Sequence, residues 1–272
     1  RLLSILRLAL RYKATDIHFE MKYSEVTIDM RIDGVFRRVK SKIGDDKLIR
    51  YLQYLSNLDI GNLLEPQTGQ FEMEVDESLL SLRFAVINNV NYTNGVLGIL
   101  NSKINVDADN LSSIEMQNKY FKSLLEKDCG LIIFSGPTGS GKTTTLYSLL
   151  NSVKGKKIYT IEDPIEVYND DFVQLQVNEQ INFNYEEAIK QILRHDPDII
   201  MVGEIRDAKA AKMAVVAANT GHLVLTTIHS SYANSVISRM KELGVNEEHL
   251  YEELLCISNQ RMMIDRNGNK LV

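Results

Sequence analysis

A glycine-rich segment that follows a short apolar run constrains the fold of this chain more than any other feature. The run Leu131–Phe134 has the length of a buried strand, and the pattern from Thr143 to Val153 is helical. Between them the sequence matches GxxxxGK followed by Ser or Thr, in the residues Gly136, Pro137, Thr138, Gly139, Ser140, Gly141, Lys142 and Thr143. A loop of this kind lets consecutive backbone N–H groups converge on a phosphate, because glycines carry no Cβ. The sequence therefore predicts a P-loop.

The predicted P-loop has a defined ligand, the triphosphate of ATP together with one Mg²⁺ ion. We expect Lys142 to reach the β- and γ-phosphates, and Thr143 to place its hydroxyl on Mg²⁺. All eight residues of the loop, with the following Thr144, are candidate nucleotide-binding residues. The alternative is a glycine-rich turn that binds nothing. The strand pattern before the loop and the helix pattern after it favour the P-loop.

A second apolar run ends in a carboxylate. Ile199–Val202 has the pattern of a buried strand, and Gly203 and Glu204 follow it directly. Ligands of parallel sheets bind at the carboxyl ends of the strands. Glu204 is therefore the candidate for the residue that polarises the attacking water. The alternative is a solvated glutamate that caps a helix.

An acidic segment follows a third predicted strand, Lys157–Ile161. It places Glu162, Asp163 and Glu166 within five residues. Carboxylates at the end of a strand suit water-mediated coordination of Mg²⁺, and Asp163 is the candidate for that ion. Glu162 and Glu166 are further candidates for catalysis. A solvated acidic turn is the alternative.

The order of these patterns divides the chain into two domains with a linker between them. Residues 1–103 predict a small α+β domain, residues 104–113 a polar linker, and residues 114–272 an α/β domain. In the last of these, apolar strands without alternation are separated by helices, which predicts a parallel sheet covered on both faces.

The first domain has its own pattern of elements. Arg1–Lys13 is helical, alternating strands flank an Asp33–Gly34 turn, and Asp46–Leu58 predicts a second helix. Tyr51, Tyr54 and Leu55 fall on one face of that helix, and we expect all three to be part of the core.

Composition excludes several classes of protein. The 272 residues carry a formal net charge of −5, so tight binding to a nucleic acid backbone is not expected. The two cysteines, Cys129 and Cys256, form no CxxC pair, which argues against a disulfide framework and a thiolate zinc site. The apolar runs are too short to cross a bilayer. The chain begins at Arg1, without an initiator Met, and we expect a trimmed fragment.

Four segments in order resemble the secretion ATPase superfamily that serves type II secretion, type IV pilus assembly and natural competence. They are the P-loop, Thr160–Glu166, Asp198–Glu204 and Thr220–His229, which look like the Walker A motif, the Asp box, an atypical Walker B motif and the His box. The resemblance implies that Glu204 is the catalytic acid. It also implies that His222 and His229 serve the nucleotide site, with His222 a candidate for nucleotide binding and His229 for catalysis.

The resemblance extends into the first domain through Ala14–Glu20 and Arg31–Val35. It implies a RecA-like ATPase core preceded by a PAS-like domain, arranged in a hexameric ring. In the family, arginines of the first domain are expected to reach the phosphates, and Arg31, Arg37 and Arg83 lie in the matching neighbourhoods. Surface ion pairing is the alternative for each of them.

Two departures from the family pattern bear on the branch. Gly98 stands where many relatives carry an arginine, so one phosphate contact or interdomain pair is in doubt. Asn259–Met263 is similar to a late segment of the family, yet no tetracysteine cluster accompanies it. Competence-type members commonly lack that zinc module, so we expect no zinc and favour this branch.

Together the resemblance and the motifs predict a hexameric Mg²⁺-ATPase that powers assembly of a competence pilus or a secretion pseudopilus. Its expected partner is a polytopic platform protein of the inner membrane, and its expected location is the cytoplasmic face of that membrane. Two alternatives remain, a nucleotide-gated scaffold with negligible turnover and a type IV secretion or DNA-translocating ATPase.

Overall fold

The computed structural model describes residues 1–22, 25–32, 35–43, 47–62, 65–89, 92–100, 106–178, 181–264 and 270–271. The described chain divides into two compact units, Arg1–Ser102 (unit 1) and Lys103–Val272 (unit 2). The predicted turn at Asp33–Gly34 and the first part of the predicted linker lie outside the described residues.

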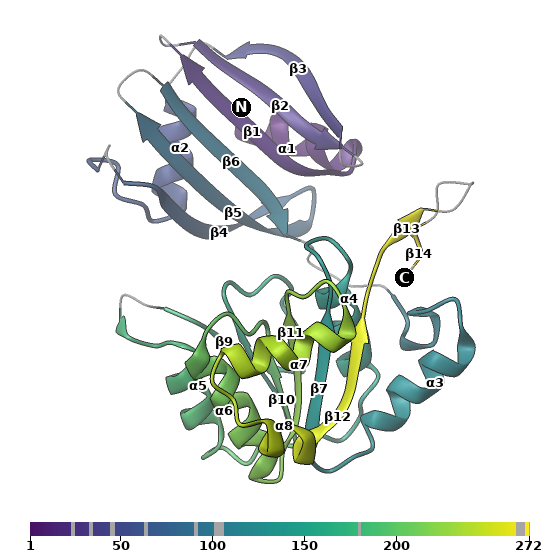
Figure 1. The fold of residues 1–272 in the computed structure, drawn as a ribbon. Helices are drawn as coiled ribbons and strands as arrows, with labels where there is room; N and C mark the ends of the chain where they lie inside the picture. Colours follow the sequence, from purple (N-terminus) through teal and green to yellow (C-terminus); the bar gives the residue numbers. More distant parts are fainter. Residues whose placement is uncertain are drawn as a thin grey trace. The chain divides into compact units, whose positions relative to one another are not determined.

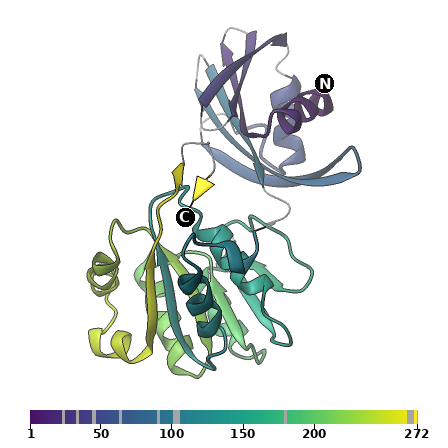
Figure 2. The same cartoon turned by 90° about the vertical axis from the view of Figure 1, so that its right-hand side faces the viewer.

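Unit 1 is one antiparallel sheet with two helices on a single face (Figures 1 and 2). Its sheet has the strand order β3-β2-β1-β6-β5-β4. The elements in chain order are α1 (Leu2–Arg11), β1 (Ala14–Lys22), β2 (Glu25–Ile32), β3 (Val35–Ile43), α2 (Lys47–Leu55), β4 (Gln67–Val75), β5 (Ser78–Asn89) and β6 (Tyr92–Leu100).

Alternation along the strands of unit 1 sends one set of side chains to the helices and the other to the opposite face. Ile17, Met30 and Phe84 are fully buried on the helix side. The polar neighbours between them are less buried. One prediction for this unit is wrong for two of its three residues. Tyr51 and Tyr54 of α2 are exposed, because the helix turns Leu48, Ile49 and Leu52 to the core instead. Leu55 packs against that core as predicted.

Unit 2 is built on a six-stranded parallel sheet with the order β12-β7-β11-β10-β8-β9. The predicted α/β class and the parallel sheet are confirmed. The elements that form or cover the sheet are η1 (Ala108–Asn110), α3 (Glu115–Leu124), β7 (Gly130–Ser135), α4 (Lys142–Asn151), β8 (Ile158–Glu162), β9 (Val173–Gln176), α5 (Tyr185–Ile192), β10 (Ile199–Val202), α6 (Ala208–Asn219), β11 (Leu223–Ile228), α7 (Ala233–Glu242), α8 (Glu247–Glu253) and β12 (Leu254–Asn259). A short pair, β13 (Met263–Ile264) and β14 (Lys270–Leu271), follows.

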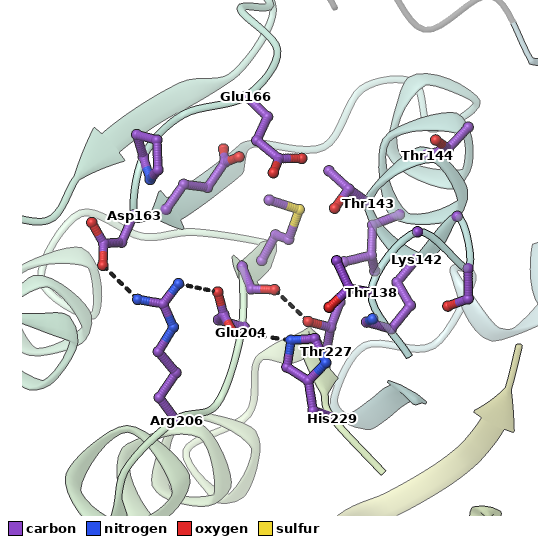
Figure 3. Close-up of a pocket in the computed structure, with 18 of the residues that line it drawn as sticks. Thr138, Lys142, Thr143, Thr144, Asp163, Glu166, Glu204, Arg206, Thr227 and His229 are labelled. Carbon is purple, nitrogen blue, oxygen red and sulfur yellow. Dashed lines mark hydrogen bonds and ion pairs between the residues drawn. The ribbon is translucent and has the colours of Figure 1, made fainter. Parts of the chain in front are cut away.

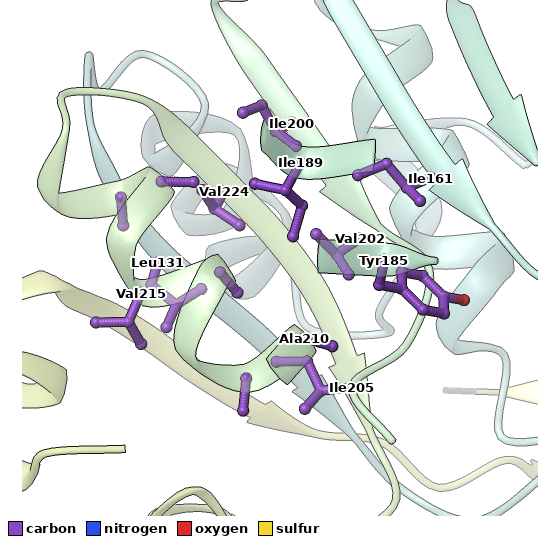
Figure 4. Packing of buried hydrophobic residues seen from close by; sticks show 14 of the residues in the cluster. Leu131, Ile161, Tyr185, Ile189, Ile200, Val202, Ile205, Ala210, Val215 and Val224 are labelled. Carbon is purple, nitrogen blue, oxygen red and sulfur yellow. The ribbon is translucent and has the colours of Figure 1, made fainter. Parts of the chain in front are cut away.

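Both faces of this sheet are buried, as the continuous apolar strands require. On one face Leu131 and Ile133 pack with α5 and α6, and Figure 4 shows part of this cluster. On the other face Ile132 and Phe134 pack with α3 and α4. Successive residues of β7 thus enter opposite cores, which fixes the strand between two helical layers.

The segment predicted as a linker contributes to unit 2 over its described part. Asp107 caps η1 by accepting a hydrogen bond from the backbone N–H of Asp109. Ala108 and Leu111 are buried in the α3–α4 core, because these two apolar side chains interrupt the polar run. Among the helices of the described chain, none is both long enough and apolar enough to cross a membrane.

Candidate functional site

A cavity of about 800 Å³ lies at the carboxyl edge of the sheet of unit 2. Four separate segments supply most of its lining: the P-loop with the first turn of α4, the segment after β8, the segment after β10, and the end of β11. Parallel strands bring these segments to one edge because their carboxyl ends all point the same way. Tyr185 and Met262 complete the lining from elsewhere in the chain.

The P-loop takes a backbone form that requires glycine. Gly136 has φ +147°, and a Cβ there would lie 2.4 Å from the carbonyl oxygen of Gln260. Gly141 is the N-cap of α4 and has φ +87°, a left-handed conformation that favours glycine. Its carbonyl oxygen accepts the hydrogen bond of the Thr145 backbone N–H. The loop therefore leads straight into the positive end of a helix, which favours an anion.

Lys142 is buried at the base of this loop. Its Nζ donates to the carbonyl oxygens of Gly136 and Pro137, at 3.0 Å each. Burial lowers the pKa of Lys142, and the carboxylates of Glu204 and Glu166 oppose that shift. Of the predicted nucleotide-binding residues in and beside the P-loop, Thr138 to Thr144 line the cavity, whereas Gly136 and Pro137 do not.

Glu162 is held in a buried network at the inner wall of the cavity. Its Oε1 accepts hydrogen bonds from Tyr147 Oη at 2.6 Å, Thr160 Oγ1 at 2.7 Å and Gln174 Nε2 at 3.4 Å. Burial raises the pKa of Glu162 although these donors lower it. Because this oxygen is already occupied, the arrangement suits a positioning role better than the catalytic role expected from the sequence.

Glu204 lies on a short turn that is tied to the strands on both sides. Gly203 N–H donates to Ile161 O at 2.8 Å, and Thr227 Oγ1 donates to Gly203 O at 2.7 Å. His229 Nε2 lies 3.5 Å from Glu204 Oε2 (Figure 3). The main chain thus aims this carboxylate into the same cavity as Lys142.

Arg206 joins two of the acidic residues across the cavity. One guanidinium nitrogen is 2.8 Å from Asp163 Oδ2, and the other binds Glu204 Oε1 (Figure 3). The hydrogen bond to Glu204 raises the pKa of Arg206, so the guanidinium stays charged. Its single positive charge offsets the repulsion between the two carboxylates, which come from different segments of the chain.

Asp163 and Glu166 also line the cavity, and Thr143 lies on the facing turn of α4. Two carboxylates opposite a threonine hydroxyl form an oxygen donor set of the kind that Mg²⁺ prefers when phosphates complete its coordination. The residues present therefore fit this ion.

The structure does not bring His222 to the cavity. His222 precedes β11 and His229 follows it, so six strand residues, or about 20 Å at the usual rise, separate them. His222 Nδ1 lies 3.1 Å from Ala217 O and 3.2 Å from Thr220 Oγ1, at the amino end of β11, whereas the cavity lies at the carboxyl ends of the strands. His222 therefore does not line the cavity of its own chain, and its service to a nucleotide site stays a prediction from the resemblance.

The three arginines of unit 1 do not share one face of their sheet. The register aligns Arg31 with Asp16, Asp16 with Gly98, and Gly98 with Arg83, so Arg31 and Arg83 face the same way. Arg37 pairs with the buried Met30 and faces the other way. These arginines remain predicted phosphate ligands.

Several residues of the site could not be identified from the sequence alone. Arg206 stands two residues after Glu204 but belongs to none of the four motifs. Tyr147, Gln174 and Tyr185 carry no motif at all. Only the fold brings Tyr147 and Gln174, from α4 and β9, to Glu162, and Tyr185, from α5, to the cavity.

Comparison with known proteins places this geometry in a family. A family model described as "Type II/IV secretion system protein" matches residues 2–268. Competence protein ComGA of Bacillus subtilis strain 168 is 38% identical over 256 residues, which cover 92% of this chain and 72% of that protein. The putative type II secretion system protein E of Escherichia coli K12 is 34% identical over 265 residues, which cover 96% of this chain and 54% of that protein. The chain thus spans about half the length of that relative.

Solved structures agree with these relatives. The pilus retraction motor PilT with bound ADP is similar with a TM-score of 0.81 and 27% identity, over 100% of this chain and 81% of that one. The Legionella pneumophila ATPase DotB is similar with a TM-score of 0.76 and 22% identity, over 98% of this chain and 77% of that one. At this identity the likeness supports a shared fold only. The predicted resemblance is confirmed: this chain belongs to the type II/IV secretion system protein family.

Proposed function

We propose that the chain is a Mg²⁺-dependent ATPase subunit that powers assembly of a competence pilus or a type II secretion pseudopilus. One observation carries the proposal. The P-loop, the Asp163 segment and Glu204 are far apart in the sequence and line one cavity at the carboxyl edge of a parallel sheet. This is the constellation that cleavage of a γ-phosphate requires.

Binding would begin at the P-loop. Backbone N–H groups at the start of α4 would receive the phosphates, and Lys142 would exchange its bonds to Gly136 and Pro137 for phosphate oxygens. The buried ammonium already has two acceptors within 3.0 Å, so the side chain is positioned before the ligand arrives. Thr143 and Asp163 would hold Mg²⁺, directly or through water, and the ion would supply charge neutralisation at the β- and γ-oxygens.

Hydrolysis would depend on Glu204. Its carboxylate would orient the attacking water and accept the developing proton. His229 and Arg206 contact its two oxygens, so the carboxylate has one defined orientation. Glu162, fixed by Tyr147 and Thr160, would support the facing wall of the cavity.

The larger assembly is proposed from the family. A homo-hexamer would let Arg31, Arg37 or Arg83 act on a phosphate across a subunit boundary, so that turnover depends on assembly. The platform protein of the inner membrane would receive the resulting movement, with the motor on the cytoplasmic face. The similarity to ComGA favours the competence branch.

A nucleotide-gated scaffold and a DNA-translocating ATPase are the competing functions. Intact Lys142, Thr143 and Glu204 speak against a scaffold without turnover. The net charge of −5 speaks against tracking a nucleic acid backbone. Hydrolysis that rises on addition of DNA would instead support the translocating ATPase.

The proposal is tested by ATP binding and by genetics. Purified full chain should bind ATP in calorimetry, and Lys142→Ala should weaken that binding by about 10-fold or more, since a charge-assisted phosphate contact is lost. In the organism that encodes it, the same substitution should abolish pilus assembly and DNA uptake. Retained uptake in that strain would argue against the assembly motor.

A further inference from the structure

Tyr185 occupies a defined place beside the cavity. It is the first residue of α5, directly after Asn184, whose side chain caps the helix by accepting from Glu187 N–H at 3.0 Å. The side chain packs in the same core cluster as Ile161 and Val202, the last core residues of β8 and β10 (Figure 4). Tyr185 also lines the cavity, with 6% of its surface exposed. Its position is therefore set by the cap, the core and the cavity together.

The hydroxyl of Tyr185 has no hydrogen-bond partner among the described residues, although its oxygen is buried. Tyr147, the buried tyrosine beside Glu162, differs in this respect. Tyr147 Oη donates to Glu162 and accepts from Gln174. A buried hydroxyl without a partner destabilises a fold, and a phenylalanine at this position would avoid that cost. An orphaned donor beside a binding cavity points to a ligand.

The surroundings of this hydroxyl define what it can bind. The charges of Asp163, Glu204, Arg206 and Glu162 all act on it. Burial and the nearby carboxylates raise the pKa of Tyr185, so the hydroxyl keeps its proton and acts as a donor. Arg206 already takes one oxygen each of Asp163 and Glu204. The guanidinium is thus already paired with these two carboxylates, whereas the Tyr185 hydroxyl is not paired with any described residue.

We propose that Tyr185 is a further nucleotide-site residue, whose hydroxyl donates a hydrogen bond to an oxygen that arrives with Mg-ATP. This oxygen belongs either to the γ-phosphate or to a water of the hydrated magnesium ion. The inference rests on the proposed function. It adds a donor to the cavity that is supplied by α5 and lies outside all four motifs.

The test is Tyr185→Phe in the full chain, which removes one oxygen and preserves the ring. The matched control is Tyr159→Phe, since Tyr159 is equally buried at 5%, lies in β8 of the same unit and does not line the cavity. We expect kcat of Tyr185→Phe to fall about 5- to 50-fold, in the range of one lost transition-state hydrogen bond. Its melting temperature should equal or exceed that of the parent. Tyr159→Phe should keep the parental kcat.

Binding of ATP with magnesium and in EDTA distinguishes the two sources of the oxygen. A γ-phosphate partner predicts weaker binding to Tyr185→Phe under both conditions, and a magnesium-bound water predicts weaker binding only with magnesium.

Parental kcat and parental ATP binding in Tyr185→Phe would overturn the inference, as would a lowered melting temperature with unchanged kinetics, which marks a structural hydroxyl. A parent that neither binds nor hydrolyses ATP would overturn this inference and the proposed function together. An active parent with an equally active variant would overturn this inference alone.

Discussion

Tyr147 Oη donates a 2.6 Å hydrogen bond to Oε1 of Glu162, and both side chains are buried. Thr160 and Gln174 donate to the same oxygen, yet burial still raises the pKa of the Glu162 carboxyl. Desolvation therefore outweighs three donors. The Glu162 carboxyl therefore ionises less readily in the folded wall of the cavity than it does in the unfolded chain.

This shift predicts a pH-dependent gain for Glu162→Gln. Below the ordinary carboxyl pKa of 4.5 the parental group is protonated in both states, so its charge costs nothing. Between pH 4.5 and the raised pKa of the folded state, the carboxyl of the unfolded chain is ionised while that of the folded chain is still protonated. The free energy of unfolding of the parent therefore falls as pH rises through this window, by about 1.4 kcal/mol for each pH unit between the two pKa values. Urea unfolding should show that the free energy of unfolding of Glu162→Gln, relative to that of the parent, is higher at pH 8 than at pH 4. A difference that does not change with pH would contradict this.

Arg206 offers a second prediction. Arg206→Ala should lower kcat about 10- to 100-fold, because Glu204 loses the donor that fixes its orientation. KM for ATP should change less, and added guanidinium should restore part of the activity.

The control for Arg206 is Lys209→Ala. Lys209 is an exposed cation nearby on α6 that pairs with Glu186 at 3.5 Å, and neither residue lines the cavity. Lys209→Ala should keep the parental kcat and the parental KM for ATP. Failure of guanidinium to rescue Arg206→Ala, with a parental melting temperature, would argue against the orientation of Glu204 by Arg206.

Gly136 is the third test, because its Cβ would meet Gln260 O at 2.4 Å with φ at +147°. Gly136→Ala should lower the free energy of unfolding by about 2–4 kcal/mol and weaken ATP binding. Gly155→Ala is the control, since Gly155 also has a positive φ, +73°, but nothing lies within 4 Å of the added Cβ. It should cost only about 1–2 kcal/mol of backbone strain. Equal losses in the two variants would contradict the packing argument.

The sequence predicted those parts of the molecule that follow from local pattern. The P-loop lies between β7 and α4 as expected, since a strand, a glycine loop and a helix are adjacent in the chain. The carboxylate of Glu204 follows β10 for the same reason. The family, inferred from four motifs in order, is confirmed by a match over residues 2–268.

Contacts between distant segments could not be predicted from such patterns. Tyr185 reaches the cavity only because α5 packs against β8 and β10. His222 and His229 belong to one motif, yet the strand between them takes them to opposite edges of the sheet. The helical spacing of Tyr51 and Tyr54 predicts a place in the core, but two apolar faces compete on α2 and the aliphatic one packs inward.

The central claim is that Glu204 prepares water for attack on a phosphate that Lys142 and the P-loop hold. Steady-state phosphate release by Glu204→Gln, measured beside the parent at saturating Mg-ATP, tests it most directly. The account predicts that the variant still binds ATP and releases phosphate about 100-fold more slowly than the parent. Equal rates of release from the parent and the variant would contradict it.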